Sequence, residues 1–345
     1  MTRWAVILAG GVGSRFWPLS TPDRPKQLLP LVNDESLLLN TFRRLADIVP
    51  VERTLVLTNA SLADAIAAAV PGLPDANIVA EPKPAGTAAA LAWAAREIER
   101  RSGPESTMLC VHADWAVADD AGFRAALLTA EEVAISEDAL VTVGIVPTRP
   151  DPGFGYVQPG EPTGYGAMAV KRFVEKPDRT RAESMLHEGY LWNSGIFVWR
   201  AGYFLSQVRA HTPEVADALD THADRGLDAF FAAVKPVSVD VGVLERSDRV
   251  RVVPADFGWD DVGTWGALRR VKPEDESGNV TSGDVFALDA KGNVVHAEAS
   301  SVVLYGVSDL VVVTRGGLTL VTTTERSAEL KKLVDSLPPH LRDFT

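Results

Sequence analysis

The stretch LAGGVGSRFWPLS, residues 8–20, follows the apolar run Trp4–Leu8 and precedes the segment RPKQL, residues 24–28. An apolar run that stops abruptly in glycines is typical of a buried strand that ends in a loop at the mouth of a parallel sheet. Glycines let backbone N–H groups approach phosphate oxygens, and Arg15 and Lys26 add positive charge. The stretch therefore predicts an α/β fold whose first loop binds a nucleoside triphosphate.

This loop differs from the two common nucleotide-binding loops. A Walker A loop ends in Gly-Lys followed by Ser or Thr, whereas this loop ends in Ser14 and Arg15. A dinucleotide fingerprint needs a third glycine at the position that Phe16 occupies. A plain glycine turn between a strand and a helix is the alternative interpretation.

The composition is that of a large acidic globular protein. The chain has 345 residues, 46% of them hydrophobic, and a formal net charge of −12, which is enough apolar sequence for more than one domain. Basic residues stand singly rather than in runs, which argues against nucleic-acid binding and suits a small anionic ligand. No apolar run reaches the length of a membrane span, and the N-terminal apolar stretch is too short for a secretory signal. The single cysteine, Cys110, lies in an apolar run and indicates a core residue in a reducing cytoplasm.

Apolar runs and helical patterns alternate through the first half of the chain, which predicts a Rossmann-like, mostly parallel sheet covered on both faces. The predicted strands are Trp4–Leu8, Thr54–Leu57, Asn77–Ala80, Thr107–Val111 and Leu140–Ile145. The predicted helices are Ser36–Ile48, Ser61–Ala69, Thr87–Arg101 and Ala121–Ser136. Beyond Pro147 the expected elements are strands Ala167–Val174, Ile196–Trp199 and Val250–Val253 and helices Thr180–Leu186 and Tyr203–Ala210.

From about Gly278 short apolar runs recur, separated by Gly, Asp and Ser, which predicts a small β appendage, similar to a few coils of β-helix. The expected strands are Asp284–Leu288, Asn293–His296, Ser301–Leu304, Leu310–Thr314 and Leu318–Thr322, followed by a helix at Ser327–Asp335. We therefore divide the chain into residues 1–277 and residues 278–345 and expect no further fused enzyme domain.

The glycine loop resembles the signature of the sugar-nucleotide pyrophosphorylases, and its ending Trp17-Pro18-Leu19-Ser20 resembles their mannose-1-phosphate guanylyltransferase branch. The resemblance covers most of residues 1–279 and implies a GT-A-like nucleotidyltransferase domain. It implies a nucleotide loop that consists of Leu8, Gly10, Gly11, Gly13, Ser14 and Arg15. It also implies that Lys26, which follows the loop, is a second phosphate-binding cation.

Two carboxylates are candidate Mg²⁺ ligands. Asp114 follows the predicted strand Thr107–Val111, and ligands of open parallel sheets sit beyond the carboxyl ends of strands; a turn or N-cap role is the alternative. The string GWDDVGTW, residues 258–265, resembles a family motif whose invariant Asp aligns with Asp261 and completes the metal site. Asp260 stands at the variable position and is expected on the surface or as a charge at a helix N-terminus.

The string EPKPAGTA, residues 81–88, resembles the family segment that contacts the base, which implies Glu81 and Thr87 as base contacts. A carboxylate suits guanine, whose ring N–H and amino group are both donors. An N-cap of the following helix is the alternative role for Thr87. The family often has a basic residue and Asn where this chain has Ala85 and Gly86, so the identity of the base stays open.

Three further strings, GFGYV, VEKP and WNSGIF, resemble the sugar-phosphate site of the family. The residues that they imply are Gly155 against the sugar, Glu175 and Asn193 at sugar hydroxyls, and Lys176 at the phosphate. The string SVDVG, residues 238–242, also resembles the family, and its Asp240 is expected to give structural support.

The resemblance implies a cytoplasmic enzyme that converts mannose 1-phosphate and GTP to GDP-mannose and pyrophosphate with Mg²⁺ as cofactor. The implied catalytic residues are Arg15, Lys26, Asp114 and Asp261. Two alternatives stay open: a nucleotidyltransferase for another sugar phosphate or base, such as UTP or dTTP, and a catalytically inactive sensor of nucleotide sugars. No nucleic-acid or membrane partner is expected, and the β appendage with its final helix is the candidate contact for a homodimer.

Overall fold

The computed structural model describes residues 1–11 and 13–342, so that Val12 of the glycine loop lies outside the described residues. The chain forms two compact units, each assembled from several segments of the sequence. The first unit comprises Met1–Gly10, Phe42–His112 and Asp119–Phe257, and the second comprises Gly11–Thr41, Ala113–Ala118 and Gly258–Thr345.

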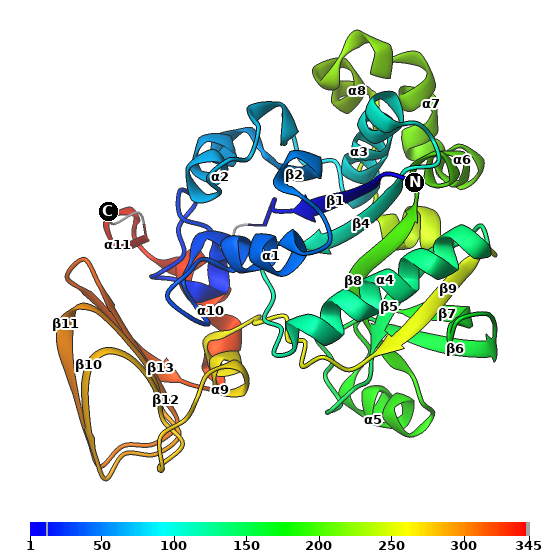
Figure 1. The fold of residues 1–345 in the computed structure, drawn as a ribbon. Helices are drawn as coiled ribbons and strands as arrows, with labels where there is room; N and C mark the ends of the chain where they lie inside the picture. The colour runs from blue at the N-terminus through cyan, green and yellow to red at the C-terminus, as the bar shows by residue number, and fades with distance from the viewer. Residues whose placement is uncertain (12, 343–345) are drawn as a thin grey trace. The chain divides into compact units, whose positions relative to one another are not determined.

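The first unit contains a nine-stranded sheet in the order β3-β2-β1-β4-β8-β5-β9-β7-β6 (Figure 1). Its strands are β1 (Arg3–Leu8), β2 (Thr54–Asn59), β3 (Ile78–Glu81), β4 (Thr107–His112), β5 (Leu140–Ile145), β6 (Tyr156–Pro162), β7 (Met168–Val174), β8 (Leu191–Arg200) and β9 (Val250–Ala255). β3, β2, β1 and β4 are parallel neighbours, and so are β5 and β9, which confirms the parallel sheet predicted for the first half of the chain.

Antiparallel strands complete this sheet. β8 runs antiparallel between β4 and β5, and β6 and β7 form an antiparallel pair. The apolar runs do not reveal the direction of β8, because a buried central strand has the same composition in either direction. β6 is not predicted at all, since its proline and glycine residues interrupt the usual alternation of a strand.

Helices pack on this sheet and bury both of its faces. α4 (Asp120–Ser136) lies across β8, β5 and β9, and α3 (Thr87–Ser102) packs against β1, β2 and α6 (Figure 1). The run Ala88–Ala95 of α3 is buried throughout, because small alanine side chains let the helix approach its neighbours closely. The remaining helices of this unit are α2 (Ala63–Ala69), α5 (Arg179–His187), α6 (Ala201–His211), α7 (Pro213–Thr221) and α8 (Leu227–Ala233), of which α7 and α8 were not expected.

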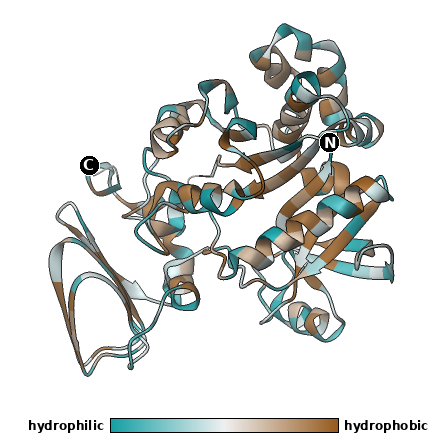
Figure 2. Cartoon of the chain, in the orientation of Figure 1, coloured by the Kyte–Doolittle hydropathy of each residue, from teal (hydrophilic) through white to brown (hydrophobic). Residues whose placement is uncertain are grey.

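Hydrophobic residues are concentrated in the strands of the large sheet (Figure 2). Trp4, Val6 and Leu8 of β1 join the core that contains α3, and the residues between them are buried as well. Cys110 is fully buried in β4, which confirms that it is a core residue, and burial raises the pKa of its thiol. Within residues 1–11 and 13–342, no helix combines the length and the hydropathy needed to cross a membrane.

The second unit contains a four-stranded sheet in the order β10-β11-β12-β13. Its strands are β10 (Val280–Leu288), β11 (Val294–Tyr305), β12 (Leu310–Arg315) and β13 (Leu318–Thr323). Its helices include α9 (Leu268–Val271), α10 (Leu330–Ser336) and α11 (Pro339–Arg342). The segment α1 (Leu37–Ala46) begins in the second unit and ends in the first. β10, β11 and β12 are parallel and β13 is antiparallel to β12, which confirms the β appendage.

The appendage has the stacked corners of a β-helix. β11 merges two strands that the sequence separated, and its register against β10 shifts between Ser282 and Asp284. At another corner the buried Asn279 and Asn293 stack, with Asn293 Nδ2 donating to Asn279 Oδ1 at 2.9 Å. Asn293 Oδ1 in turn accepts from the backbone N–H of Leu310 at 2.9 Å. Each coil therefore satisfies polar groups of the next one.

The glycine loop and the β appendage share one apolar core in the second unit. Phe16 and Trp17 of the loop pack with Trp265 and with apolar side chains of β11, β12 and β13. The Trp265 indole donates to the carbonyl of Trp17 at 3.3 Å. Arg315 of β12 donates to the carbonyls of Pro18 and Leu19 at 3.0 and 3.2 Å. The appendage therefore supports the conformation of the loop directly.

Candidate functional site

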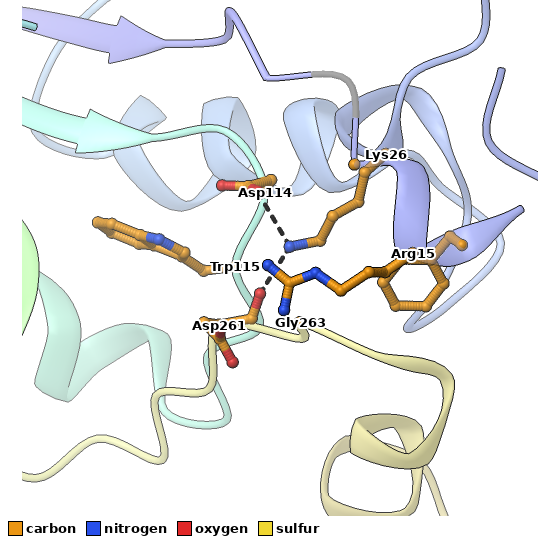
Figure 3. A pocket seen from close by; sticks show the side chains of 8 residues that line it. Arg15, Lys26, Asp114, Trp115, Asp261 and Gly263 are labelled. Atoms are coloured by element: carbon orange, nitrogen blue, oxygen red, sulfur yellow. Dashed lines mark hydrogen bonds and ion pairs between the residues drawn. The ribbon is translucent and has the colours of Figure 1, made fainter. Parts of the chain in front are cut away.

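Three loops of the second unit enclose one pocket (Figure 3). The first is the glycine loop with its continuation to Lys26, the second carries Asp114 just beyond β4, and the third carries Asp261. The cavity has a volume of about 240 Å³ and is lined by Gly13, Arg15, Phe16, Lys26, Asp114, Trp115, Asp261 and Gly263. All four residues expected to be catalytic therefore face the same space.

The Lys26 side chain points into this pocket and connects the loops of Asp114 and Asp261 (Figure 3). Its Nζ donates to Asp114 Oδ2 at 2.9 Å and to the backbone carbonyl of Asp261 at 2.6 Å. The Lys26 side chain is 7% exposed, whereas that of Asp114 is 37% exposed. Gly13 has a φ of 66°, and a Cβ there would lie 2.3 Å from Lys26 Cβ. A glycine is therefore required at position 13 to bring the loop against the lysine stem.

A short β-bridge brings the two carboxylate loops together. The backbone N–H of Ala116 donates to the carbonyl of Asp260 at 2.9 Å, and the N–H of Asp260 donates back to Ala116 at 3.0 Å. This bridge places Asp114 and Asp261, which are distant in the sequence, at the edge of one cavity.

The expectation for Asp260 is wrong. It is 5% exposed, and its carboxylate accepts from Arg270 Nε at 2.6 Å and from the backbone N–H of Val262 at 2.9 Å. Asp260 therefore holds the turn in which the neighbouring Asp261 lies. The sequence carries no signal for its partner Arg270, because only folding brings the two side chains together.

The donor set of the pocket fits a hard divalent cation. Asp114 and Asp261 supply carboxylate oxygens, and a Cβ at Gly263 would lie 2.8 Å from Asp261 Oδ2. The glycine therefore leaves room beside that carboxylate. Among the described residues, no group of three or more His, Cys, Asp or Glu side chains could hold a metal ion. A cation between these two carboxylates would complete its shell with phosphate oxygens and water, as Mg²⁺ usually does.

Gly10 and Gly11 of the glycine loop have open space beside their backbone. Leu8 is buried at the end of β1, and Ser14 begins the short 3₁₀ helix Ser14–Phe16. A Cβ at Gly10 or Gly11 would meet no atom within 4 Å. These two positions are thus glycines without a packing reason, which is expected where a ligand approaches the backbone.

The segment with Glu81 and Thr87 lies in the first unit. Glu81 is the last residue of β3. Its carboxylate has no hydrogen-bond partner within the described chain, and burial raises the pKa of this carboxylate to about 7. Thr87 is the first residue of α3, and its hydroxyl accepts from the backbone N–H of Val239 at 2.8 Å. Its N-cap alternative is wrong, because Gly86 holds that position.

Gly86 explains the departure from the family pattern at this segment. Its φ is 79°, and a Cβ there would lie 2.2 Å from the carbonyl oxygen of Val237. The Asn that the family often has at this position would collide with the backbone of Val237. The glycine is therefore a consequence of close packing between two backbones.

Gly155, Glu175 and Asn193 form a second cluster in the first unit. The backbone N–H of Asn193 donates to the carbonyl of Gly155 at 2.8 Å, and a Cβ at Gly155 would lie 2.9 Å from Glu175 Oε2. Lys176 is exposed and forms an ion pair with Glu175. Asp240 completes the cluster, since its Oδ1 accepts from Asn193 Nδ2 at 2.8 Å. The sequence assigned Asp240 only structural support and carried no signal for this contact.

The chain matches the sequence model of the nucleotidyl transferase family over residues 4–278. Residues 283–337 match the mannoseP isomerase/GMP-like beta-helix domain. The mannose-1-phosphate guanylyltransferase of Klebsiella pneumoniae is 38% identical in an alignment 352 positions long that covers 98% of this chain and 74% of the relative. The xanthan biosynthesis protein XanB of Xanthomonas campestris pv. campestris is 38% identical in an alignment 344 positions long that covers 96% of this chain and 72% of the relative.

Solved structures share the fold. A crystal structure described as a mannose-1-phosphate geranyltransferase from Thermus thermophilus has a TM-score of 0.91 and 37% identity, and the match covers 97% of this chain and 99% of that one. A UTP-bound UGPase from Acinetobacter baumannii has a TM-score of 0.51 and 18% identity over 79% of this chain and 92% of that one. At that identity the second likeness concerns the fold alone.

Proposed function

Because the chain belongs to the nucleotidyl transferase family, in its mannose-1-phosphate guanylyltransferase branch, we propose that it makes GDP-mannose and pyrophosphate from GTP and mannose 1-phosphate. One observation carries this proposal: Arg15, Lys26, Asp114 and Asp261 line a single pocket beside the glycine loop. Two cations and two carboxylates in one cavity suit a triphosphate together with a divalent metal ion.

The proposed reaction is an in-line displacement at phosphorus. An oxygen of the sugar phosphate forms a bond to the α-phosphorus of GTP, the bond from the α-phosphorus to the bridging oxygen breaks, and pyrophosphate leaves. The nucleophile is already an anion at neutral pH, so that no general base is needed. The protein therefore contributes positioning and charge stabilisation. Arg15 and Lys26 stabilise the negative charge that the triphosphate carries in the transition state.

We assign the metal site to Asp114 and Asp261. Bound there, Mg²⁺ would neutralise part of the negative charge of the phosphate groups. Lys26 now donates to both loops, and in the nucleotide complex we expect its ammonium group to turn toward the phosphates. Asp260 and Arg270 keep the Asp261 turn in place meanwhile.

The remaining residues would select the base and the sugar. In its ionised form the Glu81 carboxylate offers acceptors for the two donors of guanine. Glu175 and Asn193 offer an acceptor and a donor to sugar hydroxyls, and Lys176 offers positive charge to the sugar phosphate. Gly155 leaves the space in which Glu175 and Asn193 approach each other.

The test is pyrophosphate release with Mg²⁺ and mannose 1-phosphate, comparing GTP with ATP, UTP and dTTP. Release with GTP alone supports the proposal. Faster release with another nucleotide would keep the family and replace the base, and a panel of other sugar 1-phosphates tests the sugar in the same way. No release with any combination would favour the nucleotide-sugar sensor instead.

The same proposal extends to location, domains and oligomeric state. The enzyme acts in the cytoplasm, which the buried free thiol of Cys110 suits. Catalysis is assigned to residues 1–277, and residues 278–345 are the appendage.

The chain forms a homodimer, for which exposed apolar side chains at Phe286, Leu288, Val303 and Tyr305 on β10 and β11 are the supporting feature. Light scattering coupled to size exclusion measures that oligomeric state.

A further inference from the structure

Asp240 is a half-buried residue whose carboxylate accepts a hydrogen bond from the side chain of Asn193. Burial raises the pKa of Asp240, while the hydrogen bond from Asn193 and the nearby His112 act in the opposite direction. Removing a carboxylate from water costs free energy, which hydrogen bonds such as the one from Asn193 offset. Asp240 also begins the π-helical turn Asp240–Leu244, and such turns are frequent at functional sites.

The backbone before Asp240 is held firmly. The N–H of Val237 donates to the carbonyl of Ala85 at 3.3 Å, and the N–H of Ala88 donates to the carbonyl of Val237 at 3.2 Å. The N–H of Val239 donates to the Thr87 hydroxyl at 2.8 Å. After Asp240, its own carbonyl accepts from Glu245 at 2.8 Å. Asp240 is therefore a fixed reference point for Asn193.

The contacts of Asn193 determine the orientation of its amide. The backbone N–H of Gly195 can only donate, and it faces Asn193 Oδ1 at 3.4 Å. Nδ2 therefore faces Asp240, and it lies 3.8 Å from the position that a Cβ of Gly155 would take. Glu175 Oε2 lies 2.9 Å from that same position. An amide donor and a carboxylate acceptor thus approach one another across Gly155.

We propose that Asp240 is a positioning residue that sets sugar specificity, because it directs Asn193 Nδ2 toward a substrate hydroxyl that also donates to Glu175. An amide nitrogen has two N–H groups, so that one is held by Asp240 and the second serves the hydroxyl. The hydroxyl accepts from Asn193 and donates to the carboxylate of Glu175. This inference rests on the proposed function for the identity of the sugar phosphate.

The experiment compares the wild type with Asp240→Ala, Asp240→Asn and Asn193→Ala. The kcat/KM is measured for mannose 1-phosphate and for each of its monodeoxy analogues, together with the KM for GTP. In the wild type, removal of the hydroxyl in question should lower kcat/KM by about tenfold or more. Asp240→Ala should reduce that discrimination to about threefold or less and leave the KM for GTP unchanged.

Two comparisons separate positioning from a general loss of structure. Asp240→Asn keeps an acceptor oxygen, so that it should retain the discrimination that Asp240→Ala loses. In the Asn193→Ala background, Asp240→Ala should have little further effect, because Asp240 acts through Asn193. Asp228→Ala, at an exposed site of the same unit, is the control. If Asp240→Ala does not fold, Asp240→Ser takes its place, since its shorter side chain cannot reach Asn193 Nδ2 and must lose the same discrimination.

Undiminished discrimination in a folded Asp240→Ala, or in Asn193→Ala, would overturn the inference. The wild-type assay keeps this outcome distinct from failure of the proposed function. If the wild type prefers another sugar 1-phosphate, the deoxy analogues of that sugar are used. If it releases no pyrophosphate at all, calorimetric binding of mannose 1-phosphate and its deoxy analogues gives the same comparison without turnover.

Discussion

Replacement of Lys26 by methionine should strengthen divalent-cation binding to the nucleotide-free protein while it abolishes most of the turnover. The Lys26 ammonium lies between Asp114 Oδ2 and the backbone carbonyl of Asp261, at 2.9 and 2.6 Å, beside the place that we propose for the cation. A metal ion must displace it from Asp114. Methionine keeps an apolar stem and removes the competing charge together with its hydrogen bond to the Asp261 carbonyl.

The size of the effect follows from the geometry. At 2.9 Å two unit charges attract by about 6 kcal/mol with an effective dielectric constant of about 20. The Asp114 side chain is 37% exposed, and desolvation of the buried ammonium offsets most of this attraction. A net value of about 1.5–3 kcal/mol, typical of a charged hydrogen bond, remains. Removing this competition should tighten cation binding by about tenfold to a hundredfold.

The assay is titration with Mn²⁺, followed by electron paramagnetic resonance, without nucleotide. Lys331→Met, at an exposed position in the same unit, is the matched control and should leave the affinity unchanged. Turnover of Lys26→Met should fall by about a hundredfold or more, because the transition state loses a cation. Unchanged or weaker Mn²⁺ binding in a folded Lys26→Met would refute the competition between lysine and metal.

Three other outcomes follow from the same contacts. Asp261→Asn should lower turnover by about a hundredfold or more, with Asp256→Asn at an exposed site as the control; wild-type turnover would contradict the assigned metal site. Burial raises the pKa of Glu81 to about 7, and only its ionised form accepts from guanine, so the KM for GTP should fall as the pH rises from about 6 to 8. Glu81→Gln should remove that pH dependence, and a persisting dependence would assign it to another group. Arg315→Met loses two hydrogen bonds to the glycine loop and should raise the KM for GTP by about tenfold without changing that for mannose 1-phosphate; a parallel rise in both would indicate general unfolding, which thermal denaturation detects.

The local pattern of the chain predicted much of the fold. The five apolar runs of the first half became β1 to β5, and the alanine-rich stretch became α3, because hydrophobic periodicity and helix propensity act over a few residues. β6 escaped prediction because its glycine and prolines hide the alternation of a strand. The separate strands expected at residues 293–296 and 301–304 became the single β11, since its pairing with β10 resumes after a register shift at that place.

By itself, the sequence determined which residue types carry the chemistry: a glycine loop after β1, two basic side chains and an Asp beyond β4. Only the tertiary structure decided which of them share a cavity. The Ala116–Asp260 bridge joins the carboxylate loops, Asp260 turned out to be buried against Arg270, and Asp240 met Asn193. The first and the last of these contacts join residues far apart in the chain, and Asp260 and Arg270 are ten positions apart. The energies of all three contacts depend on packing and burial in the folded protein rather than on neighbours in sequence.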